Sequence, residues 1–182
     1  MIIHTYEGAI SLPSEGPSLK SVAVGLSRES RYAGQSLYWW PVALHTFVVC
    51  DLLPPKLKIH GLLHDAAECI VGDVPKPAKT TEMMILEDTI TASIYDHLKV
   101  SLVWSKEADE VHNADRRALH GEVHTIGIES LREVYPHDHE AEALVWKYFK
   151  QYRPEECIYA AGACPREFMR RFQEYARLAV TG

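Results

Sequence analysis

Apolar residues recur along much of this chain at the spacing of an α-helix. The clearest case lies in the segment 82–98, where the apolar positions are three and four residues apart and mark one helical face. We predict that this stripe packs in the core; its members are Met83, Leu86, Ile90 and Ile94. Long stretches in which apolar and polar residues alternate with period two are absent, so the pattern favours helices over a sheet.

Prolines and glycines divide the remaining sequence into further predicted helices. Pro41 suits a first helical position, where its missing N–H costs nothing, and Pro54-Pro55 ends the helix that follows. Ser105 suits an N-cap, and Pro165 suits the start of a last helix. The predicted helices cover residues 18–33, 42–52, 56–70, 82–98, 105–123, 140–152 and 165–178.

The length and the order of these segments predict one domain. The chain has 182 residues, and residues 1–17 contain turn-forming glycines and prolines, which indicate a loop-like lead-in. We therefore expect an all-α fold, a compact helical bundle that spans residues 1–182 as a single domain.

Composition and charge narrow the function classes. Hydrophobic residues make up 47% of the chain, but no stretch has the length and apolarity of a membrane span. The formal net charge of -6 argues against a broad nucleic-acid surface, whereas a metal ion and a few basic groups suit a small anionic ligand. The N-terminus does not resemble a secretory signal, so we expect a cytoplasmic protein whose four cysteines are free thiols.

The most informative pair of residues is His64-Asp65, which lies inside the apolar run LLHDAAE. A charge buried in such a run needs a partner or a metal ion. Glu68 follows His64 by four residues and should share its helical face. The short connection through Pro54-Pro55 predicts antiparallel neighbouring helices, which would bring His45 beside His64. A mixture of imidazoles and carboxylates suits Mn, Fe, Co or Zn better than Ca.

Three segments together resemble the HD-domain metal-dependent phosphohydrolases. Residues 60–79 (HGLLHDAAECIVGDVPKPAK) look like the central signature, and 31–49 and 106–122 look like the flanking segments of that family. The closest group is the bacterial 5′-deoxynucleotidases and the related phage dATP triphosphohydrolases. The resemblance covers most of residues 18–178, including the C-terminal PREFMRRFQEY.

The resemblance implies a metal site with four ligands, and it supplies the link between Asp115 and the other three. The implied ligands are His45, His64, Asp65 and Asp115, holding Co, Mn, Zn or Fe, with Mg as a candidate second ion. A further acidic residue of the family pattern falls at Glu122.

The same resemblance implies catalytic and substrate-binding roles. Glu68 would activate or orient the attacking water, and Asp73 would assist the leaving group or hold a second ion. The implied substrate contacts are Arg31, Tyr32, Lys76 and Lys79. Plainer interpretations stand beside these: Asp73 as a turn residue, the lysines as solvent-exposed, and Arg31 as a surface ion pair.

Other residues near the cluster receive plainer interpretations. His60 and His112 are neighbours of the predicted ligands, but we expect neither to bind the metal. Trp39 and Trp40 precede a helix and are more typical of core packing than of base stacking.

The resulting functional prediction is a metal-dependent phosphohydrolase of 2′-deoxynucleotides. Within that class the favoured activity is that of a dATP triphosphohydrolase, which releases deoxynucleoside and triphosphate. The alternatives are a 5′-deoxynucleotidase acting on deoxynucleoside monophosphates, an inactive module that binds metal and nucleotide, and a plain helical structural protein. The expected partners are the deoxynucleotide and further copies of the chain. For a phage protein the expected location is the host cytoplasm.

Overall fold

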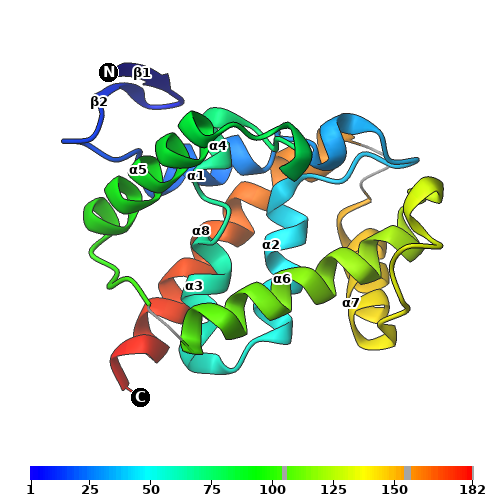
Figure 1. Cartoon of the computed structure of the whole chain (residues 1–182). Coiled ribbons are helices and arrows are strands. Elements are labelled where there is room, and N and C mark those ends of the chain that lie inside the picture. The colour runs from blue at the N-terminus through cyan, green and yellow to red at the C-terminus, as the bar shows by residue number, and fades with distance from the viewer. Residues whose placement is uncertain (104–105, 154–156, 182) are drawn as a thin grey trace.

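The computed structural model describes residues 1–103, 106–153 and 157–181, and its core is organised around one buried helix, α2 (Val42–Leu52). Every α2 side chain from Val42 to Cys50 is buried, as expected of a helix that is apolar on all sides. Figure 1 shows α2 at the centre, with other helices packed around it. The helices that contact α2 are α1 (Leu19–Leu26), α3 (Lys58–Leu63), α6 (Lys106–Thr125), α7 (His139–Tyr152) and α8 (Cys157–Thr181). The other described helices are α4 (Glu68–Val71), which contacts α1, and α5 (Thr81–Leu98).

The described elements confirm the predicted all-α class. The described residues also form one small β-hairpin near the N-terminus. Short 3₁₀ turns connect the helices at Arg31–Gly34, Pro55–Leu57, Lys76–Ala78 and Glu129–Leu131. Within the described part of the chain, no helix combines the length and the apolarity needed to cross a membrane.

Side-chain caps fix the start of three helices. Ser18 Oγ accepts the Ser21 N–H at 3.1 Å at the start of α1, and Thr80 caps α5 through the Met83 N–H at 3.3 Å. Asp138 caps α7 in the same way. These caps explain why α5 and α7 begin within a residue of the predicted positions. The predicted N-cap Ser105 lies outside the described residues.

The prediction of a first helix over residues 18–33 was wrong at its end, because α1 stops at Leu26. The chain then turns and pairs with the segment before α2: Arg31 N–H donates to Trp40 O, and Val42 N–H donates to Glu29 O. These long-range backbone bonds replace the local bonds that a longer helix would make. They hold residues 31–34, a turn in which Tyr32 and Ala33 have positive φ, beside the segment that leads into α2.

The predicted helix over residues 56–70 is divided into a 3₁₀ turn, α3 and α4. Between α3 and α4 the backbone bonds join residues three apart: Ala66 N–H to Leu63 O, and Glu68 N–H to Asp65 O. This tighter winding falls on His64 and Asp65, and mid-helix stretches of this kind often occur at functional positions. Because of this winding, Glu68 does not share the helical face of His64 as it would in a continuous α-helix.

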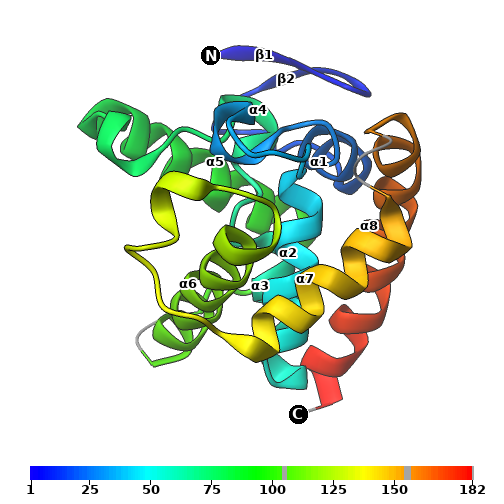
Figure 2. The ribbon, with the colours of Figure 1, turned by 90° about the vertical axis from the view of Figure 1, so that its right-hand side faces the viewer.

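Residues 1–17 are not simply a loop, as predicted, because they contain an antiparallel hairpin. Its strands are β1 (Ile2–Thr5) and β2 (Gly8–Ser11), paired from Ile2 with Ser11 to Thr5 with Gly8. Gly8 has φ of 139°, a value that favours glycine, and this permits the tight turn. The hairpin lies beyond α1 and α4 in Figure 2.

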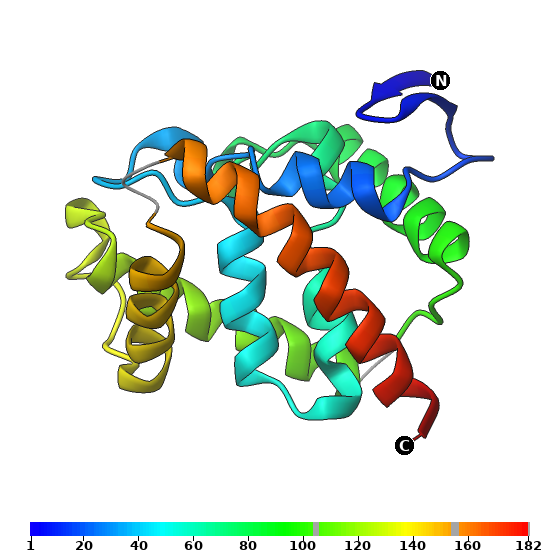
Figure 3. The ribbon, with the colours of Figure 1, turned by 180° about the vertical axis from the view of Figure 1, so that it is seen from behind.

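The last helix is longer than predicted: α8 begins at Cys157, and Pro165 lies inside it rather than at its first position. Figure 3 shows α8, coloured orange to red, running diagonally across the near side of the molecule, where it contacts α2 and α3. Buried Arg171 attaches α8 to the bundle, with its guanidinium bonded to Asp51 of α2 at 3.3 Å and to the Tyr148 hydroxyl of α7 at 2.6 Å. Pro165 has no N–H and so cannot make a backbone hydrogen bond within α8. The packing of α8 and the buried hydrogen bonds of Arg171 stabilise the helix despite this loss.

The apolar stripe on α5 is confirmed in its second half only. Ile90 and Ile94 are fully buried, whereas Met83 and Leu86 are half-buried. The neighbouring Ile85 is 61% exposed, so the first half of α5 extends past the core.

Helix α4 is held against α1 by a close backbone contact. A Cβ atom placed on Gly25 would lie 2.7 Å from Cys69 Cβ and 3.0 Å from Cys69 Cα. Only glycine allows this approach, which sets the position of α4 and of Glu68 at its first residue.

Candidate metal centre

Three helices and the turn after α3 bring the four predicted ligands together. His45 belongs to α2, His64-Asp65 follows α3, and Asp115 belongs to α6; α2, α3 and α6 contact one another pairwise (Figure 1). His45 Nε2 lies 3.1 Å from Asp115 Oδ1 and 3.6 Å from Asp65 Oδ2. His64 Nε2 lies 3.1 Å from Asp65 Oδ2 and 3.9 Å from Asp115 Oδ1. The predicted proximity of these residues is confirmed.

Both imidazoles present the same nitrogen to this centre. His45 Nδ1 is bonded to Glu122 Oε1 at 2.7 Å, and His64 Nδ1 is bonded to Gly61 O at 2.8 Å. An acceptor at Nδ1 holds the proton there and leaves the Nε2 lone pair for a metal ion. This arrangement is typical of metal-binding histidines.

The centre also contains buried atoms without hydrogen-bond partners, His64 Nε2 and Asp65 Oδ2. Such atoms cost free energy unless something binds them. A metal ion at about 2.0–2.2 Å from each ligand keeps neighbouring ligand atoms about 3.0–3.5 Å apart, close to the separations found here. Two neutral imidazoles and two carboxylates would balance a divalent charge, so the residues fit a divalent transition metal.

The acidic neighbours of His45 favour its protonated form. Burial and Arg31 act to lower the pKa of His45, but Glu122 and Asp115 outweigh them and raise it to about 10. Burial acts to raise the pKa of Asp115, yet the hydrogen bond and charge of His45 hold it well below its usual range. A metal ion that binds His45 must therefore displace a proton, and binding should release it to solvent.

Glu122 supports the centre from behind, a role that the sequence did not predict. Its buried carboxylate accepts bonds from His45, from Trp40 Nε1 at 2.8 Å, from Arg31 Nε at 3.2 Å and from the Tyr32 hydroxyl at 2.5 Å. Burial acts to raise the pKa of Glu122, but His45 and Arg31 lower it to about 2, so it stays ionised. The available signal was its spacing: seven residues after Asp115, it falls on the same face of α6 two turns later.

Replacing Glu122 by glutamine should weaken metal binding by about 10–100-fold, because the charge that orients His45 is lost. Metal titration of the purified variant followed by calorimetry measures this directly. Glu133→Gln, at an exposed position in the loop before α7, is the matched control and should bind like the wild type. Unchanged affinity in Glu122→Gln would show that His45 needs no such support.

Arg31 and Tyr32 lie at the centre, but their polar groups are already engaged. Arg31 is buried, with Nη1 3.5 Å from Asp65 Oδ2 and Nε on Glu122. Tyr32 has φ of 59°, unusual for a residue with a side chain, and its N–H donates to Asp73 Oδ2 at 2.8 Å. The alternative of a surface ion pair for Arg31 is excluded by its burial. Substrate contact by either residue stays a prediction.

Glu68 and Asp73 flank the ligands. Glu68 is buried, and its Oε2 has no hydrogen-bond partner. Burial, with repulsion from Asp65 and Asp73, raises the pKa of Glu68 to about 9. Asp73 is held by the Tyr32 N–H, and its own N–H donates to Glu29 Oε1 at 3.1 Å.

A cavity of about 370 Å³ opens beside the ligands, between α3, α5 and α6. His64, Asp65 and Asp115 line it, and so does Lys76. Apolar and aromatic side chains form much of the rest of the wall, contributed by Tyr95, Leu102, Val103 and Val111. The cavity thus joins a polar end at the ligands to a more apolar region.

The two predicted phosphate-binding lysines differ in their surroundings. Lys76 is exposed at the cavity. Lys79 Nζ is bonded to Glu87 of α5 at 2.9 Å, so its charge is already paired with a carboxylate of the same chain. Of the two, Lys76 is the better placed to meet an anion near the ligands.

Trp40, His60 and His112 surround the centre without joining it. Trp40 is fully buried, which confirms core packing. His60 is buried and stacks on Tyr95 at 6.0 Å between ring centroids, while His112 is exposed at the cavity with Nδ1 3.9 Å from Asp115 Oδ2. Neither histidine belongs to the group of ligand atoms formed by His45, His64 and Asp115.

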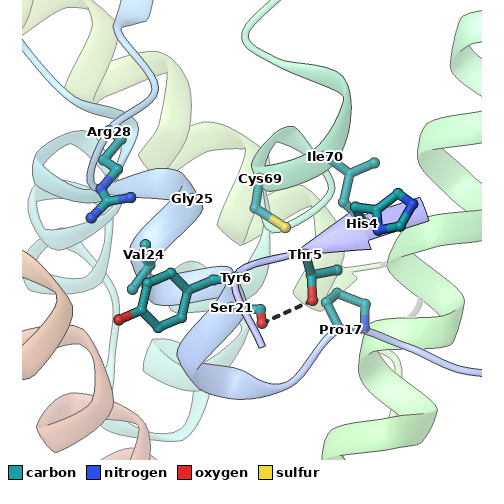
Figure 4. A pocket seen from close by; sticks show the side chains of 10 residues that line it. All are labelled: His4, Thr5, Tyr6, Pro17, Ser21, Val24, Gly25, Arg28, Cys69 and Ile70. Atoms are coloured by element: carbon teal, nitrogen blue, oxygen red, sulfur yellow. Dashed lines mark hydrogen bonds between the residues drawn. The ribbon is translucent and has the colours of Figure 1, made fainter. Parts of the chain in front are cut away.

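A second cavity, of about 210 Å³, lies between the hairpin, α1 and α4. Figure 4 shows its wall, with Thr5 and Tyr6 from the hairpin, Arg28 beyond α1 and Cys69 from α4. Burial raises the pKa of the Cys69 thiol to about 12, so this thiol is not a nucleophile at neutral pH. No group of candidate metal ligands lies in this cavity among the described residues, whereas three of the four predicted ligands line the other one.

Comparison with known proteins gives little functional information. No family model matches the chain. The uncharacterized protein YfdR of Escherichia coli (strain K12) is similar to it, with 31% identity over 104 residues. The alignment covers 54% of this chain and 58% of that protein. The name of this relative carries no activity, so the residues of the centre are the guide to function.

Proposed function

We propose that this chain is a metal-dependent phosphohydrolase of the HD-domain type, acting on 2′-deoxynucleotides. The observation that carries the proposal is the convergence of His45, His64, Asp65 and Asp115, with both imidazoles held through Nδ1 and with unpartnered atoms facing the centre. The resemblance of residues 31–49, 60–79 and 106–122 to that family adds the expectation of a phosphate ester as substrate.

A divalent ion at the four ligands would supply Lewis-acid activation of a phosphoryl oxygen and of water. The other groups belong to the chain. Glu68 would orient the attacking water and accept its proton once the ion's charge has lowered its raised pKa. Asp73 would assist departure of the leaving group, and the bond from the Tyr32 N–H holds its carboxylate in place.

The cavity beside the ligands suits a nucleotide in its general character. Its polar end, with the ligands and Lys76, would take phosphate groups, and its apolar and aromatic wall would take the sugar and base. Arg31, whose Nη1 lies 3.5 Å from Asp65 Oδ2, and the adjoining Tyr32 would contact the nucleotide near the ligands. Within the proposed class, we favour a dATP triphosphohydrolase, which expels the deoxynucleoside and releases triphosphate intact.

Product identification tests this proposal. The purified chain, loaded in turn with Co, Mn, Zn or Fe, would be incubated with dATP, dAMP and their ribonucleotide counterparts. We expect deoxyadenosine and triphosphate from dATP, and slower reaction with ATP. Release of phosphate from dAMP with dATP untouched would identify a 5′-deoxynucleotidase instead.

Absence of hydrolysis across the whole panel would contradict the enzyme proposal. If metal and dATP still bound under those conditions, the chain would be an inactive module that holds both. Equilibrium binding of metal and nucleotide, measured beside the activity, separates these outcomes.

A further inference from the structure

A second cluster of candidate metal ligands lies at the start of α7, in a part of the chain that has no role in the proposed hydrolysis. His137 Nδ1 is 2.7 Å from Glu142 Oε1, and His139 Nδ1 is 3.6 Å from Glu142 Oε2. One ligand atom from each of these three residues lies within 4.8 Å of the others. His137 precedes the helix while Glu142 lies in its first turn, so the entering chain folds an imidazole back onto the carboxylate.

The ring of His137 is held from its other side by His124. The two rings stack with centroids 3.7 Å apart and planes 19° apart, and His124 Nε2 is bonded to Tyr135 O at 2.9 Å. The stack fixes the plane of His137 while its Nδ1 stays on Glu142. Part of the ligand geometry is therefore set before any ion binds, which lowers the entropy cost of binding.

This cluster is separate from the metal centre. Both are reached by α6, but Asp115 and His124 are nine residues apart, which is two and a half helical turns. They therefore point to opposite sides of α6 and are separated by about 14 Å along its axis. Figure 2 shows the connection from α6 to α7, residues 126–138, coloured yellow-green to yellow.

Charge near the cluster favours a cation despite its place at a helix N-terminus. The N-terminal end of a helix carries a partial positive charge, which disfavours cations. Here Asp138, Glu140 and Glu142 all lie at or within the first turn of α7. Arg117 binds Asp138 and Glu140 at 2.7 Å each and leaves Glu142 for the imidazoles.

We propose that His137, His139 and Glu142 form a second, surface site for a borderline divalent ion such as Zn²⁺. Two imidazoles and one carboxylate are ligands that such ions select, and water would complete the coordination. The side chains of His137 and His139 are 60% and 87% exposed, so the ion would exchange freely with solvent. The ion would replace the proton between His137 and Glu142 and tie the connecting loop to α7.

The experiment counts bound ions. Full-length protein freed of metal with a chelator would be dialysed against micromolar Zn²⁺, and zinc per chain measured by mass spectrometry. We expect two ions in the wild type, one in the double variant His137→Ala/His139→Ala and one in His64→Ala/Asp115→Ala. His97→Ala removes an exposed histidine of α5 and should keep two.

The spectrum of bound Cu²⁺ provides a second measurement. In the His64→Ala/Asp115→Ala background, the electron spin resonance signal should show two imidazole ligands, which disappear when His137 and His139 are also replaced. Equal zinc content in the wild type and in His137→Ala/His139→Ala would overturn the second site. One ion in the wild type and none in His137→Ala/His139→Ala would instead place the failure at the proposed catalytic centre.

Discussion

Replacing His64 by alanine should abolish metal binding at the proposed centre and reduce the proposed phosphohydrolase turnover by about 1,000-fold or more. His64 contributes one of the two Nε2 atoms at the centre, and its Nδ1 bond to Gly61 O fixes the ring. A metal ion that stabilises developing charge by several kcal/mol accounts for such a factor, since each 1.4 kcal/mol is about tenfold. The measurements are turnover with dATP and metal content at the centre.

Thermal melting gives a readout that does not depend on activity. Mn²⁺ or Co²⁺ should raise the melting temperature of the wild type, because an ion that binds only the folded chain stabilises it. The same addition should have a much smaller effect on His64→Ala, while His97→Ala should respond like the wild type. A His64→Ala protein that still gains stability and retains turnover would eliminate the proposed ligand set.

Replacing Glu68 by glutamine should lower turnover by about 100- to 10,000-fold and yet make the metal-free protein more stable above neutral pH. The carboxyl is buried without a partner at Oε2, and its pKa rises from 4.5, the value of an ordinary glutamate, to about 9 in the folded chain. A folded-state pKa above the unfolded one means that the folded state binds the proton more tightly. Stability is therefore highest at low pH and falls as pH rises from about 4.5 to about 9.

A glutamine at position 68 stays neutral at every pH, so the variant does not show this loss of folding stability as pH rises. The stability advantage of metal-free Glu68→Gln should be absent near pH 4.5 and should grow steadily as pH rises toward about 9. Denaturant unfolding at several pH values measures it, with Glu133→Gln as the control. Metal content should stay at the wild-type level, because Glu68 is not a ligand in the proposed centre. Full activity in Glu68→Gln would disprove its role, and a pH-independent stability difference would contradict its raised pKa.

The sequence predicted the ligand pair because the necessary signals are local. His64-Asp65 stood out as charge inside an apolar run, and the short Pro54-Pro55 connection placed His45 beside it. Asp115 lies fifty residues later on a different helix, and no local pattern joins it to His64. Only the resemblance to a family made that link.

The supporting interactions were beyond local sequence patterns. The sequence pattern predicted Arg31 and Tyr32 at the end of a helix. In the structure the Arg31 N–H donates to Trp40 O and the Tyr32 N–H donates to the Asp73 carboxylate, and neither bond belongs to a helix. The tight winding at His64–Glu68 depends on how α3 and α4 pack against their neighbours. Glu122 had the right spacing from Asp115, but its four partners come from segments more than seventy residues away.

The close approach of Gly25 to Cys69 limits which substitutions this protein can tolerate at position 25. Position 25 has no chemistry of its own, and yet a single methyl group there would push against the backbone of α4. Cys69 is the residue after Glu68, so the displacement would be felt at the proposed catalytic carboxylate. A library designed to diversify the surface of α1 should therefore leave residue 25 unvaried, as strictly as it leaves the four ligands.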